Sequence, residues 1–135
     1  ESTFFFVWGN EKEKKEVEKL ETYFPETSRV LPRMRLPVWQ RMMAQMDLIL
    51  SVDSSSLHLA ATTKVPTYSF FGPSSPIIYK PLGEIHGTFQ GTCPYGISFT
   101  RRCPKLRTCS SGACLKNLVT ETLFDHFFKW YNKTL

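Results

Sequence analysis

Short apolar runs alternate with longer amphipathic stretches along this 135-residue chain, and this alternation constrains the fold more than any other feature. Four runs have the length of strands and are closed by Gly, Pro or Asp: residues 3–8, 28–31, 47–52 and 66–71. The stretches between them carry apolar residues at helical spacing: residues 11–23, 37–46 and 53–63. Strands that alternate with helices are typical of parallel sheets. The sequence therefore predicts an α/β fold with a mostly parallel sheet.

The remainder of the chain divides into a loop and a helix. Residues 74–114 are rich in Gly, Pro and Ser and show no sustained periodicity, so we expect a long, ordered loop there. Apolar side chains then recur at steps of three and four residues, which predicts an amphipathic helix over 115–133 that packs on the sheet. The length of the chain favours a single domain, residues 1–135, that contains both segments.

Charge and hydropathy narrow the class of partner. The formal net charge is +5, which favours anionic partners such as nucleotides, phosphorylated glycolipids or an acidic membrane surface without choosing among them. No apolar run approaches the roughly 18 residues of a membrane-spanning helix, and the N-terminus lacks the features of a signal peptide. We therefore expect a cytoplasmic location.

The four cysteines fall within one 22-residue stretch: Cys93, Cys103, Cys109 and Cys114. Structural zinc sites usually draw their ligands from close pairs, and only the last two cysteines have such a spacing. Disulfides need an oxidising compartment, which nothing else in the chain supports. Partly buried, reduced thiols in a packed loop are the interpretation we favour, with no metal bound, while zinc and disulfides remain open.

Polar residues follow directly on the strand at 47–52. Ligands of open α/β sheets lie beyond the carboxyl ends of the strands, where helix N-termini offer free N–H groups to phosphate. The run Asp53-Ser54-Ser55-Ser56 adds small hydroxyl side chains at such a position, and His58 follows one turn into the helix. The set suits a pyrophosphate. An ordinary helix cap beside a core-facing histidine remains the alternative.

The motifs of the chain resemble those of a known family. The segment VDSSSLHLAA at 52–61 and the segment FGPSSP at 71–76 are similar to the Asp-Ser/Thr-Gly-x-x-His-x-x-Ala and Phe-Gly-Pro-Thr-x-Pro signature of glycosyltransferase family 9, the lipopolysaccharide heptosyltransferases. Upstream, WGNEKE at 8–13 and VLPRM at 30–34 look like further family segments in the same order. The cysteine-bearing tail, which ends in Cys114-Leu115, is also similar to that of many members.

The resemblance implies a fold and a set of donor contacts. It places the chain in the C-terminal, donor-binding half of a GT-B glycosyltransferase, with a Rossmann-like sheet. Ser54, Ser55 and the amides after them, up to Ser56, would hold the diphosphate, while Asp53 and His58 orient it and the transferred sugar. Upstream, Glu13 would bind the ribose diol, with Glu11 as the alternative residue for this role. Met34 and Leu31 would form the apolar wall of the site for the nucleotide base. A solvated first-turn residue that complements the helix dipole remains the alternative for Glu13.

The family's chemistry implies the partners. Members transfer heptose from ADP-heptose to a lipopolysaccharide core glycolipid with inversion, so the expected partners are an ADP-sugar donor and that acceptor, at the cytoplasmic face of the inner membrane. No cofactor is required beyond the donor, Mg²⁺ is an optional addition, and no nucleic acid is expected. Two other interpretations remain open, a catalytically inactive nucleotide-binding relative and a zinc-clipped nucleic-acid-binding module.

Two departures from the family pattern stand out. Ser55 occupies a position where the family usually has Gly, and its Cβ restricts φ and can crowd a phosphate. The chain also begins at what resembles the second strand of the donor domain, so we expect the catalytic base and a phosphate-neutralising lysine to lie before Glu1. The run at 4–7 would then lack its pairing strand, and the isolated chain is expected to self-associate.

Overall fold

The computed structural model describes residues 2–135, which form two compact units, one ending at Trp39 and one running from Gln40 to Leu135. Both units combine helices with parallel strands, which confirms the predicted α/β class. Within residues 2–135, no helix has both the length and the apolarity to cross a bilayer. Each unit is described on its own below.

The first unit is a βαβ arrangement. Strands β1 (Phe4–Phe6) and β2 (Ser28–Val30) pair in parallel, and α1 (Glu11–Tyr23) connects them. Asn10 caps the helix at its N-terminus, because its extended backbone allows its side chain to accept a hydrogen bond from the first turn. Ser28 is fully buried, and its hydroxyl group donates to the Phe24 carbonyl at 2.8 Å. A backbone carbonyl thus satisfies the buried hydroxyl group of this strand residue.

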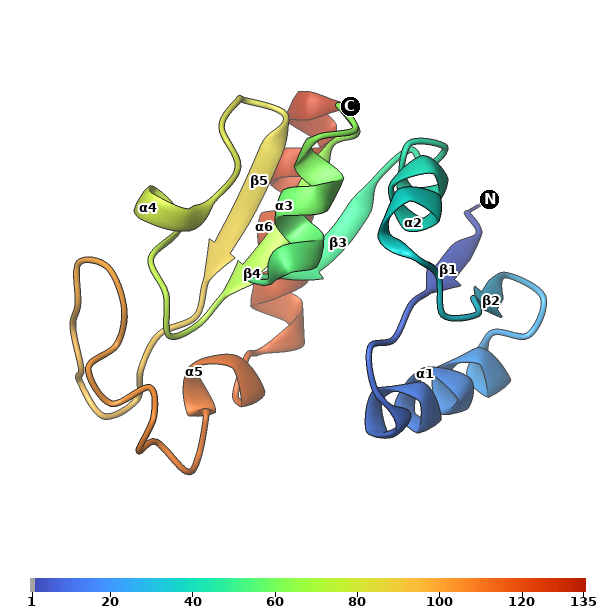
Figure 1. The fold of residues 1–135 in the computed structure, drawn as a ribbon. Helices are drawn as coiled ribbons and strands as arrows, with labels where there is room; N and C mark the ends of the chain where they lie inside the picture. The colour runs from blue at the N-terminus through green and yellow to red at the C-terminus, as the bar shows by residue number, and fades with distance from the viewer. Residues whose placement is uncertain (1) are drawn as a thin grey trace. The chain divides into compact units, whose positions relative to one another are not determined.

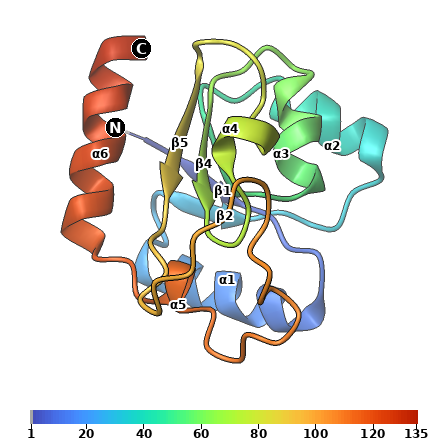
Figure 2. The same cartoon turned by 90° about the vertical axis from the view of Figure 1, so that its left-hand side faces the viewer.

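The second unit contains a three-stranded parallel sheet in the order β3-β4-β5. Its strands are β3 (Ile49–Val52), β4 (Thr67–Phe71) and β5 (His86–Gln90). The helices of this part of the chain are α2 (Leu36–Met43), which runs across the boundary between the units, α3 (Ser55–Ala61), α4 (Pro76–Tyr79), α5 (Ala113–Lys116) and α6 (Thr120–Thr134). Helix α6 lies along one face of the sheet and α3 along the other (Figures 1 and 2).

Aromatic packing holds α6 on the sheet. Tyr68 of β4 is fully buried, and its ring lies 5.1 Å from the rings of both Phe127 and Trp130. Gly87 of β5 permits this approach, because a Cβ there would lie 2.6 Å from Trp130 and from Tyr68. The Tyr68 hydroxyl is 2.7 Å from Nδ1 of His126, and burial raises the pKa of Tyr68 to about 12. On the other face, Leu57 of α3 is fully buried. The sheet therefore has a core on both faces.

Two expectations about the C-terminal half are corrected by the structure. The segment 74–114 is not loop throughout, since it contains α4 and β5. Strand β5 has the sequence HGTFQ, in which Phe89 is the only large apolar residue, so pairing with β4 determines the strand more than its own pattern does. The helix expected over 115–133 is divided into α5 and α6, because the chain leaves helical geometry around Asn117 and Val119.

Candidate functional site

The polar site predicted after β3 lies at the carboxyl edge of the second unit's sheet. Strand β3 ends at Val52 and runs parallel to β4, so the residues that follow the two strands meet at this edge. Asp53 follows β3, and the Ser74 hydroxyl, three residues beyond β4, donates to Oδ2 of Asp53 at 2.5 Å. Ser74 is buried, with 5% of its surface exposed. A carboxylate is thus fixed in place by a buried hydroxyl group from the neighbouring strand end.

His58 faces the same carboxylate from the first turns of α3. Its Nε2 atom lies 4.0 Å from Oδ1 of Asp53, which is an ion-pair distance when the imidazole is protonated but is too long for a direct hydrogen bond. The His58 side chain is 54% exposed, whereas that of Asp53 is 20% exposed. His58 is therefore not a core-facing histidine, and its ring can reach a ligand beside Asp53.

A chain of serine hydroxyls occupies the start of α3. Ser56 Oγ lies 2.5 Å from Ser54 Oγ and 3.0 Å from Ser51 Oγ. Ser54 is the N-cap residue, yet its side chain makes no capping hydrogen bond. The Leu57 N–H donates to the Ser54 carbonyl at 3.2 Å, which leaves the N–H groups of Ser55 and Ser56 for an acceptor from outside the helix. An anion with several oxygen atoms is such an acceptor.

Ser55, the residue that departs from the family's Gly, opens the helix without backbone strain. Among the non-glycine residues in the described part of the chain, Lys64 alone has a positive φ. The backbone at Ser55 therefore does not need the freedom of Gly. Its side chain is exposed and still adds bulk at a position where the family usually has Gly, which has no side chain.

The other predicted donor contacts belong to the first unit. Glu13 lies in the first turn of α1, where its Oε2 accepts from the Gly9 N–H at 2.7 Å and its own N–H donates to Oδ1 of Asn10 at 3.0 Å. These contacts are those of a helix cap. The carboxylate is exposed and retains free lone pairs, so the capping role and a role in binding a diol are compatible.

Met34 lies in the irregular segment between β2 and α2, and it is half-buried. Near it in sequence, the Leu31 carbonyl accepts a hydrogen bond from Nε1 of Trp8 at 3.0 Å. The structure therefore brings Asp53, His58 and the serines together in the second unit and places Glu13 and Met34 in the first. Ser74 is the site residue that sequence reasoning assigned no role, although its position after a strand parallel to β3 could have indicated one.

The cysteine segment is anchored next to this site. The Ser75 N–H donates to the Arg101 carbonyl at 2.8 Å, and the Cys103 N–H donates to the Pro73 carbonyl at 2.7 Å. The guanidinium group of Arg102 lies 4.7 Å from the ring centroid of Tyr79 in α4. The segment 73–75, which follows β4, therefore contacts both Asp53 and the cysteine segment.

The four cysteines line one cavity of about 140 Å³ between the end of β4, the segment 93–112 and α5. Burial raises the pKa of the Cys114 thiol, and the nearby sulfurs of Cys93, Cys109 and Cys103 raise it further, while a backbone hydrogen bond opposes them. At Cys109, a hydrogen bond from the Ser111 hydroxyl and the N–H groups of Gly112 and Ser111 lower the pKa. The thiols thus gather in one place but have different environments.

Comparison with known proteins identifies the family of the chain. The model of glycosyltransferase family 9 (heptosyltransferase) matches residues 2–108. Lipopolysaccharide heptosyltransferase 1 of Pseudomonas aeruginosa is 36% identical over 69 residues, which are 51% of this chain and 19% of that protein.

Two solved structures of the E. coli heptosyltransferase WaaC are similar to the chain. The structure with ADP is 27% identical with a TM-score of 0.60, and the matched region is 64% of this chain and 27% of the WaaC chain. The structure with ADP-2-deoxy-2-fluoro heptose is 26% identical with a TM-score of 0.59, and the matched region is 67% of this chain and 27% of the WaaC chain. The chain thus spans about a fifth to a quarter of the length of these relatives. Because the family model covers most of the chain and the solved relatives share its parallel α/β arrangement, the chain belongs to glycosyltransferase family 9, the heptosyltransferase family.

Proposed function

We propose that this chain is the donor-binding part of an inverting heptosyltransferase that takes ADP-heptose as its sugar donor. The observation that carries the proposal is the cluster of Asp53, Ser74 and His58 at the carboxyl edge of the sheet in the second unit. The solved relatives, which contain ADP or a fluorinated analogue of ADP-heptose, support the choice of nucleotide.

The proposed contacts follow from the chemistry of each group. The diphosphate lies against Ser54, Ser55 and the first N–H groups of α3, which supply donors without a counter-charge of their own. The linked hydroxyl of Ser56 keeps that of Ser54 in place at 2.5 Å. Asp53, fixed by Ser74, accepts hydrogen bonds from sugar hydroxyl groups, and His58 donates to a phosphate oxygen.

The nucleoside contacts are assigned to residues of the upstream motifs. The Glu13 carboxylate accepts hydrogen bonds from the two hydroxyl groups of the ribose, using the lone pairs that its capping contacts leave free. Met34 and Leu31 supply apolar contact for the adenine ring. We infer these contacts from the family's motifs and from the residue types at the matching positions.

In the proposed reaction, an acceptor hydroxyl oxygen attacks the anomeric carbon of the donor from the face opposite ADP. The new carbon–oxygen bond forms as the bond to the β-phosphate oxygen breaks, ADP leaves with the electron pair, and the acceptor proton passes to a carboxylate base. The N–H and hydroxyl donors at the start of α3 stabilise the charge that develops on the departing diphosphate. We assign no catalytic base among residues 2–135.

The acceptor in this proposal is a lipopolysaccharide core glycolipid, reached at the cytoplasmic face of the inner membrane. The reaction needs no bound metal, since protein donors can offset the diphosphate charge, and Mg²⁺ would act only as an additional counter-ion. Nucleic acid is not part of the proposal. A nucleotide-binding relative without activity is the second candidate, favoured by the serine at position 55, where Gly is usual.

A transfer assay tests the proposal. The complete protein that contains this chain, incubated with ADP-heptose and a heptose-deficient core acceptor, is expected to release ADP only when both substrates are present. A well-characterised heptosyltransferase serves as the positive control. Saturable ADP binding without acceptor-dependent ADP release would instead identify an inactive relative, and the absence of both would contradict the proposal.

A further inference from the structure

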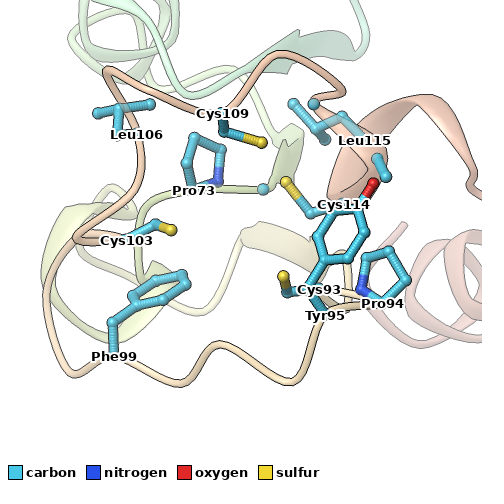
Figure 3. A pocket seen from close by; sticks show the side chains of 13 residues that line it. Pro73, Cys93, Pro94, Tyr95, Phe99, Cys103, Leu106, Cys109, Cys114 and Leu115 are labelled. Atoms are coloured by element: carbon cyan, nitrogen blue, oxygen red, sulfur yellow. The ribbon is translucent and has the colours of Figure 1, made fainter.

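The four cysteines of the chain are separated in sequence, but their side chains converge. Figure 3 shows the sulfur atoms of Cys93, Cys103, Cys109 and Cys114 pointing into the same cavity. The other residues that line it are mainly apolar, such as Phe99 and Leu115, and they include no histidine and no carboxylate. The side chains that can share a ligand in this cavity are therefore four thiols, all of them free.

The segment that carries these thiols has almost no core of its own. Between Gly91 and Ala113, every residue is exposed or half-buried, and the stretch contains neither strand nor helix. Its backbone is attached to the strand end at 73–75 by the contacts of Arg101 and Cys103. Apolar burial this small does not fix a loop of this length, and small structures in this situation commonly rely on disulfides or a bound metal.

The segment is held most closely at its C-terminal end. Gly72 and Gly91, which follow β4 and β5, contact α5 so closely that an added Cβ would lie 3.1 Å from the Cys114 sulfur at Gly72 and 1.8 Å from the Cys114 carbonyl oxygen at Gly91. Cys114 is therefore fixed against the sheet. The remaining three cysteines approach it from the irregular part of the chain.

The turn that follows Cys109 brings a polar group close to its sulfur. Gly112, in this turn, has a φ of +59°. The Ser111 hydroxyl lies 3.5 Å from the same sulfur. Hydrogen bonds of this kind orient ligating sulfurs in metal sites. An exposed thiol beside a hydroxyl group has no evident role in packing.

We propose that Cys93, Cys103, Cys109 and Cys114 bind one Zn²⁺ ion that fixes this loop against the ends of β4 and β5. Four sulfur ligands suit a closed, tetrahedral structural zinc site and disfavour hard cations such as Mg²⁺. Among residues 2–135, no three His, Cys, Asp or Glu side chains lie close enough together to hold an ion as they stand. The proposal therefore requires the loop to move inward until each sulfur lies about 2.3 Å from the metal. The inference differs from the sequence-based expectation of reduced thiols without metal.

Metal analysis of the complete chain, purified under reducing conditions without chelator, tests the proposal. About one zinc ion per chain is expected, and chelation should lower the thermal midpoint of unfolding. Cys103→Ser and Cys114→Ser should each lose most of the zinc. Ser110→Ala, a change beside Cys109 at a position that does not line the cavity, should retain it.

A second measurement is independent of whether the cysteine variants fold. Cobalt added to the unaltered chain should give the charge-transfer absorption of tetrahedral thiolate coordination, and zinc should abolish it. A chain that shows four titratable thiols in the presence of zinc and gives no cobalt spectrum would overturn the proposal, as would a disulfide found by mass spectrometry. The result does not depend on donor binding, so the proposed transferase function can fail while the zinc site stands.

Discussion

Replacing Asp53 with alanine is expected to weaken ADP binding by the complete protein by about 10- to 100-fold, which is the value of one or two hydrogen bonds to a charged group. Asp53 accepts from the buried Ser74 hydroxyl at 2.5 Å and faces His58 at 4.0 Å. Its loss frees the His58 imidazole, which is proposed to donate to a phosphate oxygen of ADP, and leaves the Ser74 hydroxyl without its acceptor. The loss is measured by titration calorimetry with ADP.

Two further variants make this experiment specific. His58→Ala should also weaken ADP binding, because the imidazole is 54% exposed beside Asp53, where it is proposed to donate to a phosphate oxygen. Asp47→Ala is the matched control, since Asp47 is exposed and precedes β3 at the opposite end of the strand from Asp53. If Asp53→Ala and His58→Ala bind ADP like the parent, the donor site is placed wrongly.

A second large effect is expected at Gly91, where alanine should destabilise the fold by about 3 kcal/mol or more, the upper end of the cost of overpacking. An added Cβ would lie 1.8 Å from the Cys114 carbonyl oxygen and 2.9 Å from its carbon. These are backbone atoms and cannot turn aside. Gly91 also donates to the Phe71 carbonyl at 2.7 Å, so a shift of the chain breaks contact with β4.

Chemical denaturation of the parent and of Gly91→Ala measures this loss of folding stability. Gly96→Ala provides the control. Gly96 has a φ of +68° but no atom within 4 Å of an added Cβ, so its substitution costs only backbone strain of roughly 1 kcal/mol. Equal effects at the two positions would show that the contact between Gly91 and α5 is less tight than the structure has it.

The sequence predicted the first half of the fold well because each element there carries its own signal. Helix α1 is found over the predicted 11–23, with Asn10 as a side-chain cap. Strand β5 was missed, because Gly87 is required by the packing of Trp130 and not by any strand propensity. A pattern within one segment cannot show a contact made by a helix more than 30 residues away.

The candidate site shows the same limit. The motif around Asp53 and His58 is continuous in sequence, and the structure places both residues at one edge of the sheet. Ser74 is contributed by another strand, and the four thiols gather only when the loop folds. Spacing along the chain therefore argued against a metal site, whereas the structure places the ligand types in one cavity.

The central claim, that this chain provides the donor site of a heptosyltransferase, is tested most directly by calorimetry of the complete protein with ADP and, separately, with UDP. We expect saturable binding of ADP, with a dissociation constant in the range of about 1 μM to 1 mM that is typical of enzyme substrates, and much weaker binding of UDP. The absence of saturable ADP binding, or an equal affinity for UDP, would contradict the account.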